Sequence, residues 1–391
     1  MPEMNKMAEA YFPQEVLAEI FKRLPVKSLL RFRSVSKSWC SLISNPQFIA
    51  LHRNYNMNNP CILVNYYPAE LYTMHYDNDA FELCAEVEYP FRRLSRYYQI
   101  LGSCNGLICV GSKLDSLASD LFIWNPSIRK FLTLPTPAIT FKSCGSHRMI
   151  IGFGFDSKTN DYKVLRMPYV PGRTGLSKVP SEVELYKVEL YKLSTGTWTG
   201  INAGAPQYEI FNSFASQATL NTVVYWAAFG LTKTGGFFNV IVAFDFSDEV
   251  FKEMSVPNTL VNKGPLTISI AACGELLSLF HYHQSSSNGC YSVWVMEKYG
   301  VDNSWTKLFN IEIDPFQGVT QMFGIRKNRD LLMVTSDGKL VSYDPHAEQA
   351  QDLGIRRGGT YLSANPYIES LNLLDRAHGV LGYDSIPRQG E

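Results

Sequence analysis

The spacing of hydrophobic residues changes near residue 60 of the chain. Between residues 13 and 52, large apolar side chains recur three or four positions apart, which places them on one face of a helix. After residue 60 the apolar residues form short runs of period two, rich in Val, Ile, Phe, Tyr and Trp and interrupted by turn residues. The pattern therefore predicts a small helical region followed by a larger, mainly β region.

The helical region predicts three to four short helices. Pro13 and Pro25 bound the first, because proline is accepted in the first turn of a helix but not inside it. Ser34 or Ser36 is the expected N-cap of the third helix, and Asn45 caps the fourth. The apolar sets of the four helices are Val16, Leu17, Ile20, Phe21 and Leu24; Leu29, Leu30 and Phe32; Val35, Trp39, Leu42 and Ile43; and Phe48, Ile49 and Leu51.

These helices offer more large apolar side chains than one internal core can use. A unit of about 40 residues also buries too little surface to be secure alone. We therefore expect another protein to cover part of the helical surface.

The β region contains internal repeats. Each unit has an apolar strand, a short turn and, in most units, a second strand with an aromatic residue. The units span residues 121–135, 188–202, 241–257, 293–311 and 340–355, with aligned starts near 124, 191, 244, 294 and 343. A period near 50 with three or four strands per unit is typical of a β-propeller blade, and an irregular β-sandwich is the alternative.

Further segments of the β region are predicted to be strands or loops. Residues 61–90 are expected to form another unit, and residues 370–374 (SLNLL) are a candidate for the last strand. Residues 168–182 and 281–290 are expected to be loops on the rims, where binding determinants commonly lie. Other strand candidates are 105–111, 162–167, 221–229, 275–280 and 330–339.

Two stretches of the chain resemble known families. Residues 12–48, FPQEVLAEIFKRLPVKSLLRFRSVSKSWCSLISNPQF, resemble the F-box, with Phe12 where that family usually has Leu. SCNGLICV (103–110), IWNPSIRKFLTLP (123–135), GFGFDSKTNDYKVLRM (152–167) and WVMEKYGVDNSW (294–305) resemble the plant F-box-associated domain. The expected architecture is an α+β multidomain chain: a disordered N-terminus over 1–11, an F-box over 12–55 and a propeller-like β domain over 60–385.

The resemblance implies a non-catalytic substrate receptor of a ubiquitin ligase. In this family the F-box docks on a Skp-type adaptor, which joins a cullin and a RING protein, while the second domain holds a protein target. The alternatives are an S-locus F-box protein acting on ribonucleases in self-incompatibility, and a propeller-type binding protein without a ligase role. By resemblance, the adaptor-binding residues are Pro13, Val16, Leu17, Ile20, Leu24, Pro25, Leu30, Val35 and Trp39.

Trp39 and Leu24 are the expected anchors of that surface, because large desolvated side chains dominate interface energies. Five basic residues are expected to surround it and to steer an acidic adaptor: Arg23, Lys27, Arg31, Arg33 and Lys37.

Composition narrows the partner classes. Among 391 residues, 36 basic and 36 acidic side chains give a formal net charge of zero, which argues against a nucleic-acid or anionic-membrane partner. No apolar run approaches the roughly 20 residues that span a bilayer, and the first residues lack an apolar signal core. Eight scattered cysteines without a CxxC pair indicate free thiols. The expected location is the cytoplasm, the nucleus or both.

No catalytic residue, metal site or cofactor is expected, because each chemical motif in the chain lacks a part that its chemistry needs. The run from Gly102 to Gly106 has the outline of a nucleophile elbow with Cys104 in the serine place, but a strand follows where that motif needs a helix. His281 and His283 have no third ligand nearby. Gly152-Phe-Gly154 indicates a strand where backbones approach closely. Four aspartates follow strand-like runs, which suits turns: Asp156, Asp161, Asp245 and Asp344.

Overall fold

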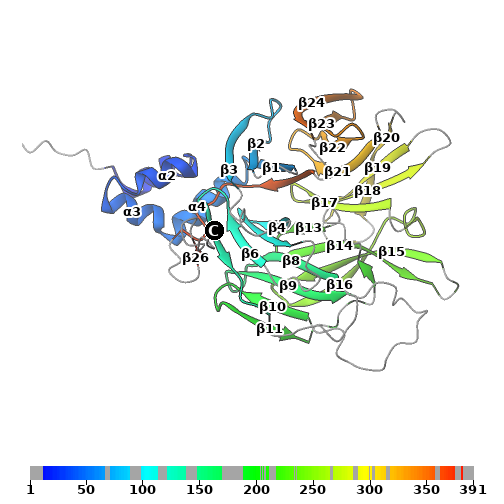
Figure 1. Ribbon diagram of the computed structural model, residues 1–391, viewed down its shortest axis with the longest axis horizontal. Helices are drawn as coiled ribbons and strands as arrows, with labels where there is room; N and C mark the ends of the chain where they lie inside the picture. Colours follow the sequence, from blue (N-terminus) through cyan, green and yellow to red (C-terminus); the bar gives the residue numbers. More distant parts are fainter. Residues whose placement is uncertain are drawn as a thin grey trace, which may run out of the picture.

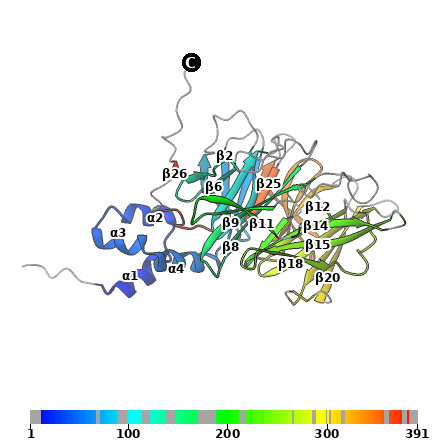
Figure 2. The ribbon, with the colours of Figure 1, turned by 90° about the horizontal axis from the view of Figure 1, so that it is seen from below.

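The computed structural model describes residues 12–66, 71–88, 98–112, 121–137, 148–169, 188–202, 204, 206, 208–210, 217–232, 234, 236–264, 267–284, 289–298, 300–301, 304–313, 318–356, 362–374 and 380–381. The expected disorder of residues 1–11 and most of the predicted loop 168–182 lie outside these residues. The described part of the chain forms four helices and 26 strands. The helices lie at one side of the β domain, with α4 nearest to it (Figures 1 and 2).

The four predicted helices are present, but Leu24 and Val35, which were assigned to the first and third apolar sets, lie between helices. Ser36 is the N-cap of α3, since its hydroxyl accepts a hydrogen bond from the Trp39 amide at 3.1 Å. Asn45 caps α4 in the same way, accepting from the Gln47 amide at 2.8 Å, with Pro46 as the first helical residue. The helices are α1 (Gln14–Phe21), α2 (Val26–Phe32), α3 (Lys37–Ser44) and α4 (Pro46–Asn56).

The described strands form six antiparallel sheets, the blades of a propeller. Blade I contains β25 (Leu362–Tyr367), β1 (Cys61–Tyr66), β2 (Leu71–Tyr76) and β3 (Leu83–Glu88). Blade II contains β4 (Tyr98–Cys104), β5 (Leu107–Ser112), β6 (Leu121–Asn125), β7 (Lys130–Thr133) and β26 (Val380–Leu381). Blade III contains β8 (Arg148–Asp156), β9 (Asp161–Tyr169), β10 (Val188–Lys192) and β11 (Thr197–Ile201).

The other three blades follow in chain order. Blade IV contains β12 (Glu209–Ile210), β13 (Gln217–Leu220), β14 (Val223–Leu231), β15 (Phe237–Asp245) and β16 (Val250–Ser255). Blade V contains β17 (Ile268–Cys273), β18 (Leu276–Gln284), β19 (Gly289–Met296) and β20 (Trp305–Ile313). Blade VI contains β21 (Val319–Ile325), β22 (Leu331–Thr335), β23 (Lys339–Asp344) and β24 (Gln349–Arg356). The predicted β-propeller is confirmed, with four described strands in four blades and five in blades II and IV, where three or four per repeat were predicted.

The ring is closed by a late strand of the chain. β25 pairs with β1, so blade I combines residues from both ends of the described β domain. The inner strand β25 also contacts the inner strands of blades VI and II, which are β21 and β4. Hydrophobic side chains between neighbouring blades form the core, for example in the cluster shared by blades I and II around Leu63, Tyr72 and Trp124. Each sheet has two apolar faces, and closure covers both.

One turn recurs in four blades and confirms the repeats. In each case an Asn or Asp at the end of a strand accepts a hydrogen bond from the backbone amide two residues later, at 2.8 to 3.0 Å. The residue four positions after it has a positive φ of 52° to 56°. The Asx residues are Asn125, Asp156, Asp245 and Asp344, and the residues with positive φ are Arg129, Asn160, Glu249 and Glu348.

Because neighbouring strands in each blade run in opposite directions, successive turns lie at opposite ends of the blade and form two different rims of the propeller. The near rim is formed by turns between first and second strands and between third and fourth strands, such as 105–106, 126–129 and 157–160. The far rim lies at the opposite ends of the strands, where second strands end and third strands begin and where the chain passes from one blade to the next, for example at Leu231 and Phe237 and at residues 256–264.

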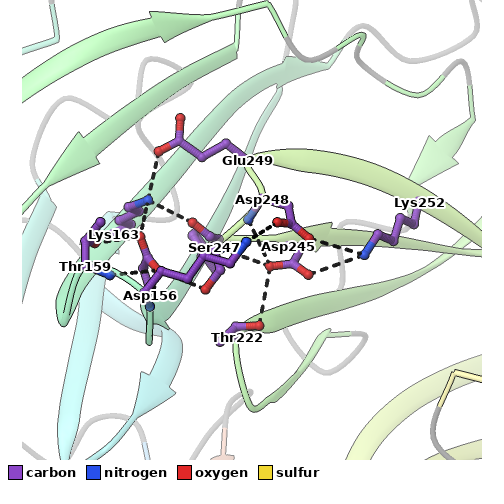
Figure 3. Close-up of polar contacts among 11 residues, drawn as sticks. Asp156, Thr159, Lys163, Thr222, Asp245, Ser247, Asp248, Glu249 and Lys252 are labelled. Atoms are coloured by element: carbon purple, nitrogen blue, oxygen red, sulfur yellow. Dashed lines mark hydrogen bonds and ion pairs between the residues drawn. The ribbon is translucent and has the colours of Figure 1, made fainter.

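Charged side chains that are largely buried join blades III and IV at the near rim (Figure 3). The Nζ of Lys163 lies 2.7 Å from a carboxylate oxygen of Asp156, 2.8 Å from one of Glu249 and 2.8 Å from the Phe246 carbonyl. Asp156 also accepts a hydrogen bond from the Ser247 hydroxyl at 2.9 Å. Three of the four aspartates that were expected to serve turns therefore do so, and Asp156 additionally joins two blades. The fourth, Asp161, is the first residue of β9 and accepts hydrogen bonds from the Ser194 amide at 2.9 Å and the Ser194 hydroxyl at 2.6 Å.

Three sequence expectations need correction. Residues 370–374 are not the last strand of the ring; β25 precedes them. Residues 281–290 are mostly strand rather than loop, because β18 extends to Gln284 and β19 begins at Gly289. At Gly154 it is the Phe246 ring, not another backbone, that approaches closely, since an added Cβ would lie 2.4 Å from that ring.

Candidate functional site

The helical region exposes large apolar side chains. On α1, Val16 and Ile20 lie one turn apart on the same face, with 42% and 44% of their surface exposed. Val35, between α2 and α3, is 61% exposed. Large exposed apolar side chains that gather in one region are a recognised mark of protein-binding surfaces.

The nine predicted adaptor-binding residues fall into two groups. Pro13, Val16, Ile20, Pro25 and Val35 are exposed. Leu17, Leu24, Leu30 and Trp39 are partly buried and pack against the internal core. Contact of these residues with an adaptor stays a prediction, and the exposed group is the part of the set that is free in this structure.

The internal core of the helices uses a different set of residues. Phe21, Val26, Leu29, Ile43 and Phe48 are buried. Sequence periodicity placed four of these on the correct helical faces, but it did not separate the inward residues from the outward ones. A helix with two covered faces gives no periodic signal that distinguishes its own core from a partner.

The charge around the exposed apolar residues is positive. No acidic residue occurs between Glu19 and Glu70, whereas that stretch contains seven lysines and arginines. Four of the five predicted basic residues are exposed: Arg23, Lys27, Arg31 and Lys37. The fifth, Arg33, is partly buried and donates a hydrogen bond to the Ser44 hydroxyl at 3.0 Å. An acidic partner complements such a surface.

The helices rest on the near rim of the propeller. The guanidinium group of Arg53 on α4 lies 5.5 Å from the ring centroid of Phe155 on β8. The buried core of the helices is continuous with that of blades II and III in one cluster. His52, fully buried on α4, donates from Nε2 to the Leu24 carbonyl at 3.0 Å, and burial lowers the pKa of this imidazole.

The far rim carries exposed aromatic side chains. Phe237, at the start of β15, is 44% exposed and contacts Phe229, with 5.6 Å between ring centroids. Tyr282, near the end of β18, is 36% exposed and packs against Tyr291 at 5.1 Å. The helices cover part of the near rim and not the far rim. The exposed aromatic side chains of blades IV and V are therefore accessible to a second partner.

The residues of the incomplete motifs lie in strands and turns of the propeller. Asn105 and Gly106 have φ values of 52° and 76° and form the two-residue turn between β4 and β5, as expected. Cys104 is buried, and burial raises the pKa of its thiol to about 12, which does not suit a nucleophile. His281 and His283 stack with 5.3 Å between ring centroids.

Within the described ranges, no group of three or more His, Cys, Asp or Glu side chains is placed to hold a metal ion. None of the helices in those ranges is both long enough and apolar enough to cross a membrane.

Comparisons with known proteins agree with the two regions. Residues 11–51 match the F-box domain, and residues 67–361 match the F-box associated beta propeller domain. F-box protein CPR1 of Arabidopsis thaliana is 29% identical over 390 residues, covering 93% of this chain and 89% of the relative. F-box/kelch-repeat protein At3g23880 of the same plant is 26% identical, covering 76% of this chain and 79% of the relative.

The similarity of this chain to solved structures is weak. An oligogalacturonate lyase in complex with manganese aligns with a TM-score of 0.40 and 9% identity, over 76% of this chain and 79% of the lyase, which is too low to support an argument. None of these matches separates the S-locus group from its wider family, so that alternative stays untested. The family-model matches cover most of the chain, and it therefore belongs to the plant F-box proteins that carry an F-box associated β propeller domain.

Proposed function

We propose that the chain is the substrate-recognition subunit of a Skp–cullin–F-box ubiquitin ligase. The observation that carries this proposal is the exposed apolar surface of the F-box, in which Val16, Ile20 and Val35 have no internal partner that covers them. The surrounding basic residues match an acidic Skp-type adaptor, which in turn joins the cullin and its RING protein.

The β domain binds the protein target in this proposal. We place the target on the far rim, because the F-box lies against the near rim and the far rim exposes Phe237 and Tyr282. The chain itself supplies no catalytic group. It raises the effective concentration of the target beside the ubiquitin-carrying enzyme, which turns a two-body encounter into a nearly intramolecular transfer. Such a role places the protein in the cytoplasm or the nucleus.

Affinity purification from plant cells with the proteasome inhibited tests both surfaces. Wild type is expected to bring down the adaptor and the cullin, and Ile20→Arg is expected to lose both. Met57→Arg is the matched control, since Met57 is an exposed apolar residue outside the predicted set. Absence of adaptor and cullin from the wild-type sample would overturn the proposal.

The same experiment tests the target-binding rim. Phe237→Asp and Tyr282→Asp should keep the adaptor and the cullin but lose a further protein that co-purifies with wild type and with Ile20→Arg. If both variants keep every such protein, the target binds elsewhere on the β domain.

A further inference from the structure

A short segment after the last ring strand joins the F-box to the propeller. Residues 368–374 follow β25 directly and pass between the helices and the turns of blade II. On the F-box side, the Asn56 side-chain amide at the end of α4 donates to the Glu369 carbonyl at 3.2 Å. The Glu369 carboxyl lies beside the backbone of Val26, the first residue of α2, and its partial burial there raises its pKa. One residue of the segment thus contacts two helices of the F-box.

On the propeller side, the segment is held by side-chain amides. Asn125, at the end of β6, is fully buried and donates to the carbonyls of Ser370 at 3.0 Å and Asn372 at 2.9 Å. The Asn372 amide donates to the Asn105 carbonyl at 2.8 Å and to the Tyr162 hydroxyl at 2.9 Å. These bonds fix the segment to blades II and III.

The segment packs closely against Gly106 in the turn between β4 and β5. A Cβ on Gly106 would lie 2.5 Å from the Ser370 hydroxyl oxygen and 2.6 Å from the Ile368 carbonyl oxygen. Leu371, Leu373 and Leu374 are buried in the cluster that also contains the F-box core. The segment is therefore part of the hydrophobic core of both domains.

The direct covalent connection between the domains is short. Four residues, 57–60, separate the end of α4 from the start of β1. Such a linker keeps the domains close but leaves their relative angle free unless other contacts fix it.

We propose that residues 368–374 are a brace that holds the F-box at one angle on the near rim, with Glu369 as its positioning residue. The brace thereby fixes the distance and direction from the adaptor-binding surface of the F-box to the far rim of the propeller. Its consequence for ubiquitin transfer rests on the proposed function, because transfer depends on where the target is held. The fixed angle between the F-box and the propeller does not depend on the proposed function.

Pulsed electron paramagnetic resonance on the full chain tests the brace without an adaptor or a target. Spin labels on non-canonical amino acids at Ser41 and Ser336, both exposed, report the distance from the F-box to blade VI. Wild type is expected to give one narrow distance distribution. Glu369→Lys should roughly double its width, because a charged side chain of the wrong sign and shape beside Val26 weakens the packing of the segment against the F-box, while the four-residue linker restrains the angle little.

Matched variants separate the brace from general instability. Glu369→Gln keeps the size and polarity of the side chain beside Val26 and should keep the narrow distribution, whereas Glu312→Lys makes the same charge change as Glu369→Lys at an exposed carboxylate and should not broaden it. If Glu369→Lys does not fold, Asn56→Ala removes the bond to the Glu369 carbonyl from the F-box side and should broaden the distribution to a smaller degree.

The outcomes are distinguishable from failure of the proposed function. A broad distribution in wild type, or a narrow one in folded Glu369→Lys and Asn56→Ala, overturns the brace. Adaptor affinity should be equal in wild type and Glu369→Lys, since the exposed residues of the F-box surface are untouched. Loss of adaptor binding in wild type would contradict the proposed function while the distance measurement still decides on the brace.

Discussion

The indole ring of Trp39 lies edge-on to the ring of Phe21, with 5.0 Å between ring centroids and an interplanar angle of 78°. Phe32 contacts both rings, at 5.5 Å from Phe21 and 5.3 Å from Trp39. Trp39 therefore joins α3 to α1 and α2. A loss of adaptor binding after its substitution would have two explanations, the lost contact and the weakened helices.

Trp39→Ala is expected to lower the free energy of unfolding of the F-box by about 2 to 3 kcal/mol. The value lies at or below the range for buried aromatic residues because the ring is partly exposed. Hydrogen exchange of the amides in α1 to α3 measures it, and Trp39→Phe should lose less. Unchanged exchange in Trp39→Ala would show that the ring belongs to the adaptor surface alone.

Replacing Lys163 by methionine should destabilise the propeller by about 3 to 5 kcal/mol, because it leaves the Asp156 charge buried without its partner. The two side chains are 3% and 1% exposed. Denaturant unfolding of the full chain measures the loss.

The matched control is Lys252→Met. Lys252 is exposed and lies 3.4 Å from a carboxylate oxygen of Asp245, so its loss should cost below about 1 kcal/mol. Equal destabilisation by the two substitutions would contradict the role of Lys163 as a buried clamp between blades III and IV.

Acid should destabilise the propeller through His281 on β18 of blade V. Burial, with the nearby charges of His283, Lys263 and Lys307, lowers the pKa of its imidazole to about 4. Its unfolded pKa is near 6.5. Below that value the unfolded chain binds a proton that the folded chain does not, so stability falls as the pH drops from about 6.5 to about 4.

His281→Asn removes this titration, and the slope of stability against pH in that window should become shallower than in wild type. Unfolding midpoints at several pH values measure the slope. His346→Asn is the control, because His346 is exposed on the turn after β23. A shallower slope only in the His346 variant would contradict the assignment.

Gly154→Ala should destabilise the chain by about 1 to 3 kcal/mol through overpacking against Phe246. The second substitution Phe246→Leu should recover part of the loss, so the two effects are not additive. Gly200 on β11 has no atom within 4 Å of an added Cβ, and Gly200→Ala should change stability little. Thermal unfolding of wild type, Gly154→Ala, Phe246→Leu and the double variant measures the coupling between the two positions. Strictly additive losses of stability would show that the Phe246 ring does not cause the strain.

The sequence predicted the elements with strong local signals. Ser36, Asn45 and the Asx turns are set by hydrogen bonds within two or three residues, so they are visible in a single chain. The third strands β6, β10, β15, β19 and β23 contain the predicted repeat starts, because alternating apolar residues and a following turn mark them.

Ring closure could not be predicted in the same way. β25 (LSANPY) contains a proline and few large apolar residues, while SLNLL has the more strand-like composition. Pairing of β25 with β1 is a long-range contact, and the leucines of residues 371–374 are apolar because they pack beneath the F-box. The division of the F-box residues into core and surface likewise depends on tertiary packing that periodicity does not encode.

The affinity of the purified full chain for a purified Skp-type adaptor tests the central claim most directly. Wild type and Met57→Arg should bind equally, whereas Ile20→Arg and Val35→Arg should each weaken binding by at least about 30-fold, the effect of losing an anchor worth about 2 kcal/mol or more. No binding by wild type, or equal binding by all four folded proteins, would contradict the assignment of this surface to the adaptor.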